Sequence, residues 1–91
     1  MARVELMIQN QGAVAFNASA SQGDSSLRVV TNAEGLAPPH FPGTRDELLR
    51  LSNQNCNLLM EFYRLPYIGG NSLADVDAKR RQIALHIGVR W

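Results

Sequence analysis

The sequence predicts an α+β fold, in which a three-stranded antiparallel sheet is followed by two α-helices in a single two-layer domain covering residues 1–91. Three observations support this prediction. Apolar and polar residues alternate with a period of two in the first third, a proline-rich stretch follows, and the second half contains two helix-starting motifs. A chain of this size buries about 60 to 65% of its unfolded surface, which is enough for one core.

The predicted sheet is a β-meander over residues 1–32. Residues 4–8 place Val, Leu and Ile side chains on one face, as in a half-buried strand. Asn10-Gln11-Gly12 is a turn signal, and the alternation resumes over residues 14–18, which predicts an antiparallel hairpin. Residues 27–31 are rich in β-branched side chains, so we expect the third strand there.

A stiff connector and a long helix follow the sheet. Residues 36–43 contain three prolines, which remove backbone donors and favour extended geometry. Thr44 and Glu47 then form a capping box that starts a helix, predicted over residues 44–65. The segment Ser52-Asn53-Gln54-Asn55 contains poor helix formers, so a break of the helix at that point is the alternative.

A second helix is predicted over residues 72–88. Ser72 and Asp75 form another capping box, and Gly88 is placed to end the helix as its C-cap. Residues 83–91 also alternate with a period of two, so a terminal strand is a competing interpretation. The caps and the acid-before-base pairs four residues apart favour the helix.

Composition and spacing exclude several classes of function. His40, Cys56 and His86 lie too far apart in sequence for a metal motif, so we expect no metal, no cofactor and no enzyme activity. The pattern Asn17-Ala18-Ser19 matches a glycosylation acceptor, which we interpret as chance in a chain with one cysteine and no signal peptide. The same features predict a cytoplasmic protein, and no apolar run is long enough to span a membrane.

The apolar surface of the helix over residues 44–65 predicts the function. Its apolar arc of about 220° is roughly twice what one packing surface requires. The sheet and the second helix could cover it within the domain, and a partner is the other possibility. Six residues occupy consecutive a and d positions of a heptad: Leu48, Leu51, Asn55, Leu58, Phe62 and Leu65. A small non-enzymatic regulatory or assembly protein is therefore predicted, which binds another protein and homodimerises through this face. Trp91, a large aromatic residue at the chain end, is a further interface candidate.

A nucleic-acid-binding regulator is the alternative. Four basic residues near the C-terminus could contact phosphates: Lys79, Arg80, Arg81 and Arg90. The net charge of only +1 and the acids that precede the run favour a solvated helix face instead.

Overall fold

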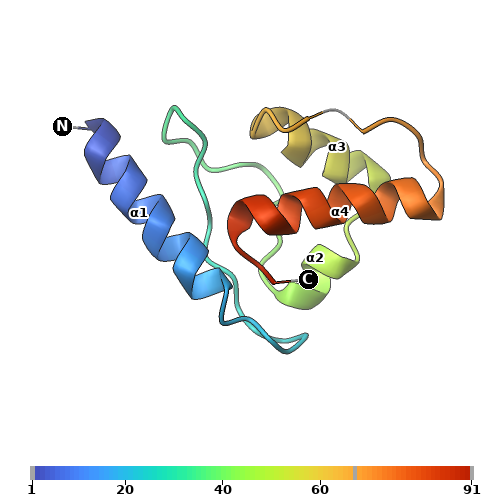
Figure 1. Ribbon diagram of the computed structural model, residues 1–91, viewed down its shortest axis with the longest axis horizontal. Helices are drawn as coiled ribbons and strands as arrows, with labels where there is room; N and C mark the ends of the chain where they lie inside the picture. The colour runs from blue at the N-terminus through green and yellow to red at the C-terminus, as the bar shows by residue number, and fades with distance from the viewer. Residues whose placement is uncertain (1, 67, 91) are drawn as a thin grey trace.

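The computed structural model describes residues 2–66 and 68–90, and for residues 2–9 it describes the backbone alone. Four helices form within this part of the chain: α1 (Ala2–Asn17), α2 (Arg45–Leu49), α3 (Asn53–Phe62) and α4 (Leu73–Ile87). Helices α1, α2 and α3 each contact α4, and α1 does so from one side of the group that the other three form (Figure 1). The fold is therefore helical.

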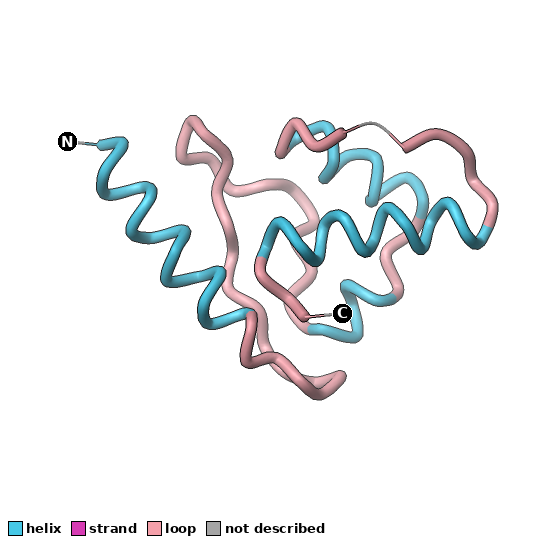
Figure 2. The backbone as a smooth tube through the Cα atoms, in the orientation of Figure 1, coloured by secondary structure: helices cyan, strands magenta, loops and turns pink. Residues whose placement is uncertain are grey.

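The predicted α+β fold and its three-stranded sheet over residues 1–32 are wrong. Figure 2 shows helices joined by loops, and no strand is assigned anywhere in residues 2–66 or 68–90. The closest approach to a sheet is one isolated antiparallel bridge between Ser26 and Thr44. Residues 2–17, where two strands were expected, form α1 instead.

The face of α1 that packs against the rest of the molecule explains why the alternation of apolar and polar residues led to the prediction of strands. Asn10, Ala13 and Asn17 follow one another at spacings of three and four, the helical period, and all three are buried or half-buried. Two of the three are amides, so a search for apolar periodicity passes over this face.

The predicted third strand, residues 27–31, runs extended beside α1 and is bound by amide side chains instead of a neighbouring strand. Asn17 accepts from Arg28 N at 2.7 Å and donates to Arg28 O at 3.0 Å. Asn10 makes the same pair of bonds to Thr31, at 3.1 Å and 3.2 Å. Asn10 and Asn17 are seven residues apart in a helix, and Arg28 and Thr31 are three residues apart in an extended chain. Both separations are about 10 Å, so each amide lies opposite the residue that it binds.

The single long helix expected over residues 44–65 is also wrong, and the break that stood as the alternative is present. Helix α2 ends at Leu49, and Ser52 starts α3 as its N-cap by accepting from Asn55 N at 3.1 Å. The predicted start is confirmed, because Thr44 Oγ1 accepts from Glu47 N at 3.2 Å. The Glu47 carboxylate, however, accepts from Gly43 N and not from Thr44 N.

Helix α4 and its caps are confirmed. Ser72 and Asp75 form the complete capping box, and Gly88 is the C-cap in a left-handed conformation with φ 93°. The helix continues to Ile87, so residues 83–87 do not form the competing strand. A Cβ at position 88 would clash with the Val14 carbonyl, which fixes how closely the end of α4 approaches α1.

The core is centred on α2, α3 and α4, and it extends to Ala13 of α1 and to Leu27 and Val30 of the segment that follows α1. Its fully buried side chains come from all three helices: Leu48, Cys56, Leu59, Ile83, Ala84 and Ile87. Tyr63 follows α3, and its hydroxyl donates to Val30 O at 2.6 Å, which ties the extended segment to this core.

Candidate protein-interaction surface

Leu48 and Leu51, the first two residues of the predicted interface, belong to the core. Leu48 lies in α2 and is 0% exposed, and Leu51 lies in the break between helices and is 6% exposed. Neither side chain can reach a partner without unfolding. The heptad pattern is also interrupted at this point, since the helix does not continue from residue 48 to residue 65.

The second half of the pattern stays on one face of α3. Asn55, Leu58 and Phe62 follow at spacings of three and four within the helix, and Leu65 lies just beyond its end. Leu58 is 42% exposed, whereas the other three are half-buried. Leu58 is therefore the member of the predicted interface that is most available to a partner.

An apolar groove lies beside Leu58. It has a volume of about 370 Å³ and is lined by five residues: Asn57, Met60, Glu61, Leu65 and Ile68. Met60, Leu65 and Ile68 provide its apolar surface, while Asn57 and Glu61 are exposed. Leu58 does not line the groove itself, but it stands three residues before Glu61 on the same helix, so it lies next to the rim of the groove.

Asn55 lines a different and more polar cleft of about 460 Å³ at the break between α2 and α3. Its neighbours there include His40, Arg50 and Ser52. An asparagine in a dry seam would need a partner for its amide, either a mate across a two-fold axis or a backbone group. At the edge of an open polar cleft, water can satisfy the amide, so Asn55 does not require such a mate.

Trp91, the remaining interface candidate, lies outside the described residues.

Two of the four basic residues assigned to phosphate binding are engaged inside the fold. Lys79 is 1% exposed, and its Nζ donates to Asn53 Oδ1 and to Gly70 O, both at 2.7 Å. Arg80 donates to Leu51 O from Nε at 2.9 Å and from Nη2 at 2.7 Å. These bonds join α4 to the break between α2 and α3.

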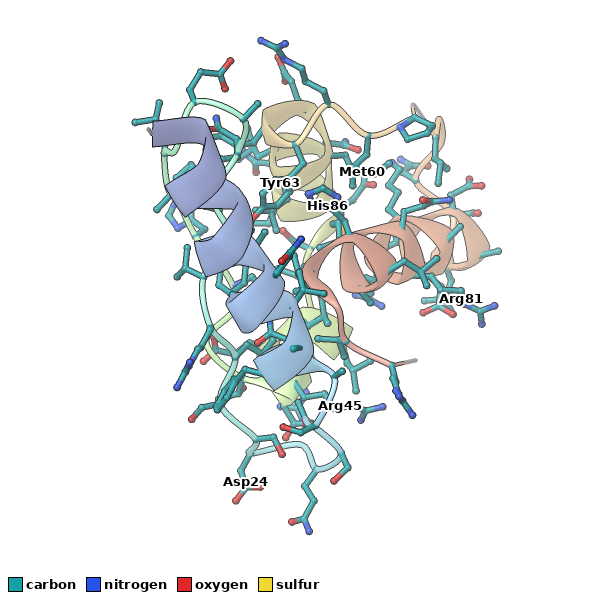
Figure 3. The ribbon with its side chains drawn as sticks, turned by 60° about the vertical axis from the view of Figure 1, so that its left-hand side comes forward. Asp24, Arg45, Met60, Tyr63, Arg81 and His86 are labelled. Atoms are coloured by element: carbon teal, nitrogen blue, oxygen red, sulfur yellow. The ribbon has the colours of Figure 1, made fainter. Side chains whose placement is uncertain are left out.

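Arg81 and Arg90 are exposed, and Figure 3 shows the Arg81 side chain pointing outward from α4. Two surface arginines give far less phosphate neutralisation than the four that were expected. The solvated-face interpretation is also incomplete, because Lys79 and Arg80 are hydrogen-bonded within the molecule. No sequence pattern distinguished Lys79 and Arg80, which are buried or half-buried, from Arg81 and Arg90, which are exposed.

Reactive groups do not gather in the described part of the chain. No group of three or more His, Cys, Asp or Glu residues there could hold a metal ion. Cys56 is buried, and this burial raises the pKa of its thiol despite the opposing charges of Arg80 and Lys79. Among the described residues, no helix combines the length and the apolar character needed to cross a membrane.

Comparison of the chain with protein-family models, with curated proteins and with solved structures gave no match.

Proposed function

We propose that the chain is a small non-enzymatic protein-interaction module that forms a homodimer through the outward face of α3. The observation that carries this proposal is the pairing of Leu58, 42% exposed, with the apolar groove beside it. A large aliphatic side chain in water is common on its own. A protruding leucine next to a groove that fits one is less common, and it makes this face complementary to itself.

A two-fold interface requires a self-complementary surface, because both copies present the same patch. Where residue i of the first copy contacts residue j of the second, residue j of the first also contacts residue i of the second. Leu58 of one copy can enter the groove of the second, while the second returns the same contact. A cavity of about 150 Å³ holds a benzene ring, so a groove of about 370 Å³ accommodates a leucine side chain.

The interface is small, so the dimer should be weak. Fully burying a leucine contributes about 1.5 to 3 kcal/mol, and Leu58 is already more than half buried, which leaves about 1 kcal/mol per copy. A stable complex buries about 800 Å² on each partner, more than the face of a ten-residue helix offers. The two leucine contacts together supply about 2 kcal/mol of the roughly 5.5 kcal/mol that a dissociation constant of about 100 µM requires, so the rest of the face must contribute, and we expect a dissociation constant no tighter than on the order of 100 µM.

Sedimentation velocity of the full chain tests the proposal. We compare the wild type with Leu58→Asp and with Leu73→Asp from about 10 µM to about 1 mM. Leu73 is a matched control, because it is 82% exposed in the first turn of α4 and does not line the groove. Circular dichroism at the same concentrations verifies that all three proteins are folded.

The wild type and Leu73→Asp should shift toward the dimer as concentration rises, and Leu58→Asp should remain a monomer. A wild type that stays monomeric at about 1 mM, or a dimer that both substitutions weaken equally, would overturn the proposal.

We assign this dimer to the cytoplasm, where it would act as a regulatory or assembly protein for another protein. The support is the single cysteine, which allows no internal disulfide, together with the burial of Cys56 in the core.

A further inference from the structure

Hydrogen-bonded amides provide much of the attachment of α1 in residues 10–17. Asn17 is 0% exposed and bonds to Arg28 N, Arg28 O and Ile87 O. Asn10 bonds to Thr31 N and O, and it also accepts from the Thr31 hydroxyl at 3.0 Å. These bonds anchor one face of α1 to the extended segment, and the bond to Ile87 anchors it to the end of α4.

Apolar packing contributes less over the same residues. Ala13 is the buried apolar side chain of this stretch, and it is small. Val14 is half-buried, and Phe16 is 37% exposed with the Arg28 guanidinium 4.2 Å above its ring. Leu48, Leu59 and Ile83, by contrast, are large apolar side chains that α2, α3 and α4 bury completely.

A cleft of about 300 Å³ lies between α1 and that core. Asn10 and Val14 line it from α1, and Val30, Tyr63 and His86 line it from the other side. The Tyr63 and His86 rings lie 4.6 Å apart, and Figure 3 shows the pair between α1 and α4. The cleft reduces the packing between α1 and the core.

We propose that α1 is a latch, which opens as a unit while α2, α3 and α4 stay folded. Opening exchanges the amide bonds of Asn10 and Asn17 for bonds to water and exposes little apolar surface in residues 10–17. It uncovers the backbone of residues 28–31 together with the buried ring of Tyr63. Asn10 and Asn17 therefore set how often the latch opens.

Hydrogen exchange of the full chain tests the latch, with mass spectrometry to resolve the helices. In the wild type, amides of residues 2–17 should exchange faster than those of α3 and α4, through an opening that leaves the core protected. Asn17→Ala should accelerate exchange in residues 2–17 by tenfold or more and leave α3 and α4 unchanged. Asn71→Ala is the matched control, because this exposed asparagine lies in the loop before α4 and does not line the groove.

Two results would overturn the latch. Asn17→Ala could accelerate exchange equally in α1, α3 and α4, which would show that α1 unfolds only together with the core. It could also leave residues 2–17 unchanged, which would show that the amide bonds do not hold the helix. If Asn17→Ala does not fold, Asn10→Ala replaces it and is judged by the same two criteria. This variant keeps Asn17, whose amide is fully buried.

Discussion

Arg80 should be a structural residue, and its replacement by methionine should destabilise the fold. Arg80 Nε and Nη2 both donate to Leu51 O, and the side chain is only 17% exposed. Methionine keeps much of the apolar stem and removes the guanidinium, so the loss reports mainly on these bonds. Leu51 O would then retain only the distant Cys56 thiol, at 3.9 Å.

The expected loss of stability comes from leaving the Leu51 carbonyl without its charged donor. A hydrogen bond to a charged group contributes about 1.5 to 3 kcal/mol, and a buried acceptor without a partner costs about 1 to 3 kcal/mol. Both ranges describe the same interaction between Arg80 and Leu51 O, so they are not added. We expect a loss of about 2 kcal/mol in the free energy of unfolding. The ion pair of Arg80 with Asp77 is long, at 3.9 Å, and adds little.

Thermal and urea unfolding, followed by circular dichroism at 222 nm, measure this loss. For a domain of this size, about 2 kcal/mol lowers Tm by about 8 to 16 °C. Arg90→Met is the control, because Arg90 is exposed and its replacement should stay within about 0.5 kcal/mol of the wild type. Equal stabilities of Arg80→Met, Arg90→Met and the wild type would refute the structural role of Arg80.

Three further predictions concern pH and backbone geometry. Burial raises the pKa of Tyr63 above its ordinary value of 10, so stability should fall as pH rises above about 10, and Tyr63→Phe should remove this decline in pH-dependent unfolding curves. Burial lowers the pKa of His86 below 6.5, so stability should fall as pH drops below about 6.5, and a His86→Gln variant that keeps the full decline would contradict this cause. Gly88→Ala should cost more than about 1 kcal/mol in urea unfolding, because φ is 93° and the new Cβ meets the Val14 carbonyl; wild-type stability would refute that contact.

Helix α4 could be predicted because its signals are local. The side chains of Ser72 and Asp75 satisfy backbone groups within one turn, and Gly88 adopts a conformation that few other residues tolerate. Such signals depend on neighbours in sequence, so they do not require knowledge of the tertiary structure. The start of α2 at Thr44 was predictable for the same reason.

The break between α2 and α3 was visible only as an alternative. Ser52 is a good N-cap, but a serine within a helical pattern does not by itself end a helix. What stabilises the break is long-range, because Arg80, 29 residues away, binds the carbonyl of Leu51. The apolar arc counted over residues 44–65 consequently combined two helices that bury different faces.

The N-terminal prediction was wrong because local alternation competed with a tertiary arrangement. Residues 27–31 do run extended, but Asn10 and Asn17 satisfy the backbones of Thr31 and Arg28 where a strand was expected to do so. The spacing of seven between the two asparagines was the available signal. It becomes informative only once α1 is known to be a helix.

The interface prediction depended on which leucines remain at the surface, and sequence periodicity does not reveal this. Leu51 and Leu58 occupy equivalent heptad positions, seven residues apart, yet one is 6% exposed and the other is 42% exposed. Lys79 and Arg81 differ in the same way, although they stand two residues apart. Burial is set by which elements pack over each side chain, and this requires the tertiary structure.

Disulfide trapping between Leu58→Cys and Ile68→Cys variants tests the proposed association most directly. If each Leu58 enters the groove of a second copy, an oxidised mixture of the two variants should form a mixed dimer on a non-reducing gel. The buried Cys56 is common to both variants and serves as the background. The reciprocal contact predicts clearly more cross-link in the mixture than in either variant alone. Equal cross-linking in all three samples would contradict a dimer in which Leu58 lies in its partner's groove.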